Sequence, residues 1–101
     1  MRDRQFEFEW DDVKAVANAR KHGVSFDNAR TVFKDPLLLT VADLDHSENE
    51  ERWFSVGRAD NGSVLSVAYL WFEAEPSITK IRVISARKAT RTEMRQYEES
   101  S

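Results

Sequence analysis

The strongest constraint on the fold is a change of hydrophobic period at Asp35-Pro36. Before this dipeptide, apolar residues recur at helical spacing, and after it they follow the alternation and β-branched enrichment of strands. A helix that reaches this point ends there, because proline cannot donate the next helical hydrogen bond. The sequence therefore predicts an α+β protein with its sheet mainly after Pro36.

Two helices are expected before Pro36. Asp11 is the expected N-cap of the first helix, Gly23 is expected to end it at positive φ, and Ser25 is expected to cap the second. The apolar residues of the first helix recur at helical spacing and are expected to face the core: Val13, Val16 and Ala17. A polar stripe is expected to face solvent: Lys14, Asn18, Lys21 and His22.

Strand-like segments follow the helices. The expected strands are Leu37 to Val41, Arg52 to Arg58, Val64 to Phe72 and Ile78 to Ala86, with an N-terminal edge strand around Phe6, Phe8 and Trp10. Asn61-Gly62 predicts a hairpin turn, and Thr90 with Glu93 predicts a capping box at a short final helix. We therefore expect a single domain over residues 1–101, in which two N-terminal helices pack on a mostly antiparallel sheet of four to five strands and a short C-terminal helix follows.

Composition narrows the compartment and the ligand classes. The 101 residues include no cysteine, and no apolar run approaches the ~20 residues of a transmembrane helix, so we expect a cytoplasmic protein. A formal net charge of −3 argues weakly against a generic nucleic-acid binder. The basic residues are concentrated after residue 78, however, and can form a basic face if the fold brings them together.

No metal or cofactor site is expected. The two histidines, His22 and His46, lack zinc-site spacing, and the acidic segment Asp43 to Glu51 lacks the EF-hand glycine. Three isolated glycines make neither a phosphate loop nor a dinucleotide fingerprint.

The remaining polar residues suit electrostatic chemistry on a phosphodiester. Arginine donors match phosphate oxygens, and Lys21 and His22 stand where a helix end favours positive charge. Strand alternation puts Arg52 and Arg58 on one face, whereas it puts Arg82 opposite Arg87. The alternative interpretation is that each arginine is a solvated strand residue or an ion-pair partner.

Five blocks of sequence resemble the BrnT (DUF497) family of toxins. They are F-E-W-D at Phe8 to Asp11, N-x-x-K-H-G-V-S-F at Asn18 to Phe26, V-F-x-D-P at Val32 to Pro36, D-H-S-x-x-E-E-R at Asp45 to Arg52, and I-x-x-I-S-A-R-K-A-T-R at Ile81 to Arg91. The resemblance covers residues 6 to 98 in unbroken order.

This resemblance implies a RelE-like fold and a metal-independent endoribonuclease toxin of a type II toxin-antitoxin system. It implies a BrnA-type ribbon-helix-helix antitoxin as partner, RNA as substrate, and contact with operator DNA only through the antitoxin complex, with no membrane partner. A non-catalytic module that binds an antitoxin and helps to repress the operon is the alternative function.

The resemblance also suggests site residues. The catalytic candidates are Lys21, His22, Glu51, Arg52 and Arg87, and the candidates for RNA phosphate contacts are Arg58, Arg82 and Arg91. His22 is the acid/base candidate and Glu51 a base or an orienter, so the identity of the general base stays open.

Overall fold

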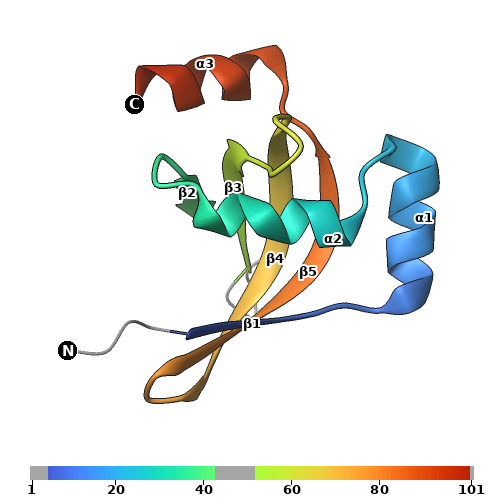
Figure 1. Ribbon diagram of the computed structural model, residues 1–101, viewed down its shortest axis with the longest axis vertical. Coiled ribbons are helices and arrows are strands. Elements are labelled where there is room, and N and C mark those ends of the chain that lie inside the picture. Colours follow the sequence, from blue (N-terminus) through green and yellow to red (C-terminus); the bar gives the residue numbers. More distant parts are fainter. Residues whose placement is uncertain (1–4, 43–51, 101) are drawn as a thin grey trace.

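A five-stranded sheet runs through the centre of the molecule in the order β1-β5-β4-β3-β2 (Figure 1). The structure is a computed structural model that describes residues 5–42 and 52–100. Its elements are β1 (Gln5–Glu9), α1 (Asp12–His22), α2 (Phe26–Ala29), the 3-10 helix η1 (Arg30–Lys34), β2 (Leu39–Ala42), β3 (Arg52–Arg58), β4 (Val64–Glu75), β5 (Ile78–Lys88) and α3 (Arg91–Glu99). No helix in these ranges is long and apolar enough to cross a membrane.

The sheet is mixed, which corrects the mostly antiparallel sheet predicted above. Strands β2 to β5 pair in antiparallel fashion, but β1 joins the edge of β5 as a parallel strand, with Phe6 opposite Thr79 and Phe8 opposite Ile81. The alternation of Phe6, Phe8 and Trp10 predicts a strand at an edge, but it carries no information about direction. Whether β1 runs parallel or antiparallel to β5 depends on the path of the helices and strands that separate them in the sequence.

The predicted helix ends are confirmed. The Asp11 carboxylate accepts from the amides of Val13 and Lys14, and Gly23 ends α1 at φ +69°. The Ser25 hydroxyl accepts from the amide of Asn28 at the start of α2. The second helix is tighter than predicted, since it continues as 3-10 from Arg30 onward.

The predicted orientation of α1 is wrong. Val13 and Val16 are 78% and 54% exposed, whereas Asn18, predicted to face solvent, is buried. The helix instead contacts β5 through the side that carries Ala15 and Asn18. Val13, Val16 and Ala17 do share one side of the helix, but burying these three small side chains stabilises little. The hydrogen bonds of the Asn18 side chain to the backbone of β5 stabilise the opposite orientation more.

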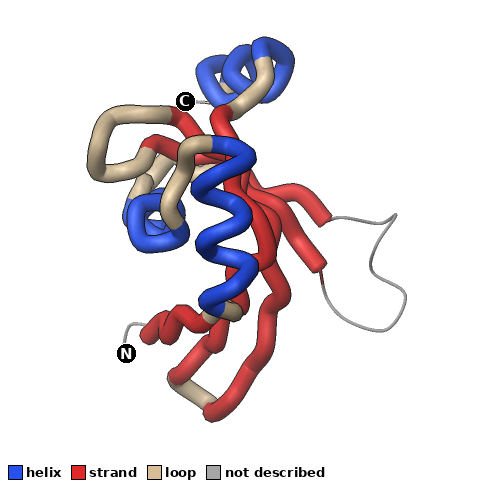
Figure 2. Tube along the Cα trace, turned by 90° about the vertical axis from the view of Figure 1, so that its right-hand side faces the viewer, coloured by secondary structure: helices blue, strands red, loops and turns tan. Residues whose placement is uncertain are grey.

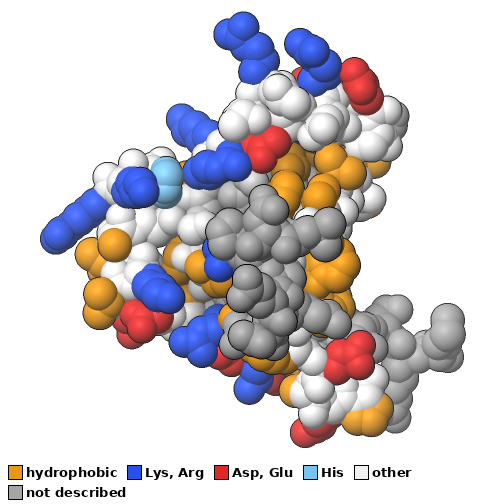
Figure 3. Space-filling view, turned by 180° about the vertical axis from the view of Figure 1, so that it is seen from behind, with side chains coloured by type: hydrophobic (Ala, Val, Ile, Leu, Met, Phe, Trp, Pro, Cys, Tyr) orange, Lys and Arg blue, Asp and Glu red, His pale blue; other side chains and the backbone are white. Residues whose placement is uncertain are grey.

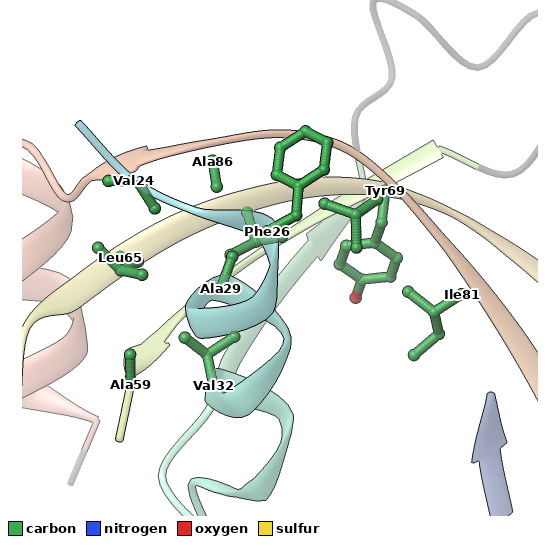
Figure 4. Close-up of a cluster of buried hydrophobic side chains, with 11 residues drawn as sticks. Val24, Phe26, Ala29, Val32, Ala59, Leu65, Tyr69, Ile81 and Ala86 are labelled. Atoms are coloured by element: carbon green, nitrogen blue, oxygen red, sulfur yellow. The ribbon is translucent and has the colours of Figure 1, made fainter. Parts of the chain in front are cut away.

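The main core lies between the sheet and α2 with η1 (Figures 2 and 4). The helical segment contributes Phe26, Ala29 and Val32, which are at most 2% exposed. The sheet contributes buried side chains from its inner strands: Leu65, Val67, Tyr69, Ile81, Val83 and Ala86. One face of the sheet is therefore covered by α2 and η1.

The other face is covered at one end by α3. Tyr97 and Met94 pack there against Val56 and Val64. Asp35 connects this helix to the rest, because its carboxylate accepts from the Tyr97 hydroxyl and from the amides of Arg58 and Leu37. Burial would raise the pKa of Asp35, but these donors together hold it below its usual value.

Candidate functional site

Four basic side chains project from β3 and β5, the strands on either side of β4, on the sheet face that α2 and η1 do not cover. We call this surface the basic face and define it by Arg52 of β3 and Lys80, Arg82 and Arg87 of β5. Buried residues alternate with them and point to the core, among them Ile81, Val83 and Ala86. Figure 3 views the molecule from behind and shows Lys and Arg side chains gathered beside α1 and over α3.

A β-bulge brings Arg82 onto this face. Ala68 of β4 lies opposite Ser85, but the next residue, Tyr69, lies opposite Val83, so Ile84 is an extra residue in β5. The bulge restores the parity of Arg82 with Arg87, and the prediction that the two point to opposite faces is wrong. Counting alternate residues along β5 gives the wrong face because it assumes that the pairing of β4 with β5 is continuous.

Cross-strand pairing arranges the basic face in rows. Read from β3 through β4 to β5, the rows are Val56, Ser66 and Arg87; then Phe54, Ala68 and Ser85; then Arg52, Leu70 and Arg82. Successive rows lie about 7 Å apart, two residues along each strand. The arginines therefore border a middle row whose β4 and β5 positions carry only small side chains.

Arg87 is held in place by α3. Its guanidinium donates two hydrogen bonds to the Glu93 carboxylate, Nη1 to Oε1 at 2.7 Å and Nη2 to Oε2 at 3.0 Å. Glu93 Oε1 also accepts from the amide of Thr90, which completes the predicted capping box. The hydrogen bonds from Arg87 are the main cause that lowers the pKa of Glu93, and the same bonds raise the pKa of Arg87. The Arg87 side chain is still 42% exposed and can meet a ligand.

Arg82 and Lys80 share a second carboxylate, that of Glu9 on the parallel strand β1. Arg82 Nη1 lies 3.5 Å from Glu9 Oε2, and Lys80 Nζ lies 3.7 Å from Glu9 Oε1. All three side chains are more than a third exposed, so the contacts are surface ion pairs that a phosphate can replace at small cost. Arg52 is half-buried at the start of β3.

The end of α1 lies beside the basic face. Asn18 Oδ1 accepts from the amide of Ala86 at 3.0 Å, and Asn18 Nδ2 donates to the carbonyls of Ala86 and Val24 at 2.9 and 3.0 Å. Ala86 immediately precedes Arg87, and His22 lies one turn beyond Asn18, so the last turn of α1 and the Arg87 end of β5 lie together (Figure 1). Lys21 is exposed in that turn and His22 is half-buried.

The other candidates lie apart or outside the description. Arg58 is on the same face as Arg52 but at the far end of β3, where its Nη1 donates to the carbonyl of Gly62. Arg91 is exposed in the first turn of α3. Glu51 lies outside the described residues, and the structure groups only Arg52, Arg82 and Arg87 on the sheet with Lys21 and His22 at its edge.

Sequence reasoning missed four contributors: Asn18, Glu9, Lys80 and the contact of Glu93 with Arg87. The capping box pointed to Glu93, but its partner Arg87 depended on how α3 returns to the sheet. Glu9 was visible only as a polar strand residue, because its neighbours Lys80 and Arg82 are more than 70 residues away. Asn18 opens one of the motif blocks, and this was the one available signal.

The opposite side of the molecule carries an aromatic pocket of about 360 Å³. Its lining is Phe6, Phe33, Leu38, Thr40, Trp53, Tyr69 and Trp71, with no lysine or arginine among these residues. A pocket without cations does not suit a phosphodiester. Within the described residues there is also no group of three or more His, Asp or Glu side chains arranged to hold a metal ion.

Comparison with known proteins agrees with the motif blocks. Residues 10–93 match the family described as the ribonuclease toxin BrnT of type II toxin-antitoxin systems. Comparison with curated proteins finds no match. Among solved structures, the Brucella abortus ribonuclease toxin BrnT superposes with a TM-score of 0.61 at 19% sequence identity, over 86% of this chain and 99% of that one, which shows a shared fold. The chain therefore belongs to the BrnT family of ribonuclease toxins of type II toxin-antitoxin systems.

Proposed function

We propose that this chain cleaves RNA on the basic face by a metal-independent reaction. The observation that supports this most is that Arg52, Arg82 and Arg87 project from one side of the sheet, around a row whose β4 and β5 positions carry small side chains. Fixed guanidinium groups neutralise the charge that grows on a phosphorane without requiring a cation from solution.

The proposed reaction uses the RNA's own 2'-hydroxyl as nucleophile. The 2'-oxygen forms a bond to phosphorus, the bond from phosphorus to the 5'-oxygen breaks, and the products end in a 2',3'-cyclic phosphate and a 5'-hydroxyl. His22 accepts the proton of the 2'-hydroxyl, and Glu51 serves as a second base or as an orienter. Water or a protonated side chain supplies the proton of the leaving 5'-oxygen.

The charged groups divide the remaining tasks. Arg52 and Arg87 contact the reacting phosphate, and Arg82 holds a neighbouring one. Lys21 adds positive charge at the end of α1, while Arg58 and Arg91 contact the RNA further from the scissile bond.

Product analysis tests the mechanism. The full chain is incubated with a single-stranded RNA in EDTA, and the new ends are identified by their reactivity toward polynucleotide kinase and phosphatase. We expect cleavage in EDTA, with 5'-hydroxyl ends. Ends that carry a 5'-phosphate, together with loss of cleavage on chelation, would contradict the mechanism.

We further propose a BrnA-type ribbon-helix-helix antitoxin as the partner and the cytoplasm as the site of action. Support comes from the family, since a type II system pairs its toxin with a protein antitoxin. Induced expression of the chain alone should arrest growth, and co-expression of the neighbouring ribbon-helix-helix protein should restore it. A gel shift with operator DNA should appear with the complex but not with the toxin alone. Unimpaired growth without the partner would favour the alternative of a non-catalytic binding module.

A further inference from the structure

The middle row of the basic face contains one aromatic side chain, Phe54. Its neighbours in the strand, Trp53 and Ser55, point to the opposite face, where Trp53 packs on the main core and Ser55 is fully buried. Phe54 therefore projects onto the basic face, and Arg52 lies two residues away on the same side.

Phe54 does not serve either hydrophobic cluster. The main core and the α3 cluster both lack it, and none of the ring contacts within the described residues involves it. It is half-buried, whereas the next position on the same face, Val56, is buried under α3. An aromatic ring on a sheet face without an aromatic partner is available to a planar ligand.

The positions beside Phe54 on the β4 side are small, and Val41 of β2 lies opposite it on the other side. Across β4 and β5 its row continues with Ala68 and Ser85, and Ser66 lies in the next row. Ala68 and Ser85 are too small to cover the ring, and the two serines carry hydroxyl groups that can bond an adjacent base or sugar.

The surrounding charges specify what kind of planar ligand fits. Arg87 lies one row to one side of Phe54, and Arg52 and Arg82 lie one row to the other, each row about 7 Å away. A flat ring between anion-binding arginines matches a nucleotide, with its base on the aromatic side chain and its phosphates on the guanidinium groups.

We propose that Phe54 is a stacking platform for one unpaired base of the RNA substrate. This rests on the proposed function, and it adds that the substrate is single-stranded at the cleavage site, because a base within a duplex cannot reach the ring. Stacking on a phenyl ring tolerates every base, so the contact contributes affinity and position more than sequence preference.

The test measures the affinity of the full chain for a fluorescent single-stranded 2'-O-methyl RNA, which cannot undergo attack by a 2'-hydroxyl. Phe54→Tyr keeps an aromatic face, and Phe54→Leu keeps apolar volume without one. The control, Phe6→Leu, removes a ring that is 39% exposed in the aromatic pocket on the opposite face. A thermal midpoint for each variant reports folding.

Loss of one stacked base costs about 5- to 100-fold in affinity. We expect that loss for Phe54→Leu, and binding within about 3-fold of the original chain for Phe54→Tyr and Phe6→Leu. Binding to an oligonucleotide with abasic sites should change little between Phe54→Leu and the original chain.

Two outcomes separate this inference from the proposed function. If Phe54→Leu binds like the original chain while Arg82→Ala and Arg52→Ala bind weakly, the stacking platform is wrong and the basic face stands. If the arginine variants also bind like the original chain, RNA does not bind the basic face and both proposals are overturned.

Discussion

Asn18 stabilises the part of β5 that has no neighbouring strand. Strand β1 pairs only with Ile78–Arg82, so the amide and carbonyl of Ala86 beyond it require another partner. The Asn18 side chain supplies both a donor and an acceptor there, at 2.9 and 3.0 Å. One buried amide thus substitutes for a strand and fixes the end of α1 next to Arg87.

We predict that Asn18→Ala destabilises the protein by about 2–4 kcal/mol, because it leaves buried backbone groups of β5 unsatisfied. Thermal unfolding should show a fall of the midpoint by roughly 4–8 °C per kcal/mol for a chain of this size. Lys14→Ala, an exposed change one turn earlier in the same helix, is the control and should shift the midpoint little. Equal midpoints for Asn18→Ala and the control would show that the contact to Ala86 is not structural.

The side of α1 that faces the core and the sheet face that carries Arg82 could not be predicted from the sequence. Val13 and Val16 had helical spacing, yet a three-residue stripe cannot compete with the satisfaction of sheet backbone by Asn18. Arg82 was assigned to the wrong face because a bulge at Ile84 gives no sequence signal as clear as a glycine or proline. Caps at Asp11, Gly23 and Ser25 were predicted correctly because they depend only on adjacent residues.

At the scale of elements, β3 passes close to η1 and Leu38 at Gly57, where a side chain would be crowded. A Cβ added at Gly57 would lie 2.7 Å from Leu38 Cδ1 and 3.2 Å from Val32 Cβ. Strand β3 thereby approaches the helical layer, and its start presents Arg52 and Phe54 on the other side.

We predict that Gly57→Ala costs about 1–3 kcal/mol of unfolding free energy through overpacking against Val32 and Leu38. Chemical denaturation measures the change. Thr92→Ala, an exposed change on α3, is the control and should alter the free energy of unfolding little. A neutral Gly57→Ala would mean that η1 and β3 are not packed this closely.

The position of α3 depends on a pair that responds to pH. The pKa of Glu93 is lowered in the folded protein, chiefly by its hydrogen bonds from Arg87. The Glu93–Arg87 pair therefore stabilises the folded protein fully at pH values above the ordinary pKa of glutamate, about 4.3. This stabilisation is lost as the pH falls through the lower pKa that Glu93 has in the folded protein.

We predict that Glu93→Gln destabilises the protein by about 1 kcal/mol at pH 7, a value discounted because Arg87 is partly exposed. The difference from the original chain should shrink as the pH falls below about 4. Urea unfolding at several pH values measures it, with Glu99→Gln on the same helix as the control. A difference that does not depend on pH would rule out the ion pair as its cause.

Most strands and caps follow from local pattern, but the pairing of strands does not. Turn residues at Asn61-Gly62 and Pro76 predicted the successive β3, β4 and β5, because neighbours in sequence joined by short turns pair with each other. The parallel contact of β1 with β5 joins residues more than 70 positions apart, for which the sequence has no local signal. The RelE-like description stays a prediction.

At the scale of the whole molecule, the two faces of the sheet have different characters. One face carries the core and an aromatic pocket without cations, and the other carries Arg52, Arg82 and Arg87. A formal net charge of −3 for the whole chain gives no sign of this division. Residue types and motif blocks were sufficient to name the site candidates, but only the folded sheet determines which of them share a face.

The most direct test compares two arginines with matched surroundings on opposite faces. Arg82 on the basic face and Arg30 on the helical side are each 46% exposed, and they lie 3.5 and 3.8 Å from one carboxylate. RNA cleavage rates are measured for Arg82→Ala and Arg30→Ala alongside thermal midpoints. Loss of a charged contact to the neighbouring phosphate should slow cleavage of subsaturating RNA by Arg82→Ala about 10- to 100-fold. Arg30→Ala should stay within about 3-fold at an unchanged midpoint. Equal rates for the two variants, or a larger loss for Arg30→Ala, would contradict RNA cleavage on the basic face.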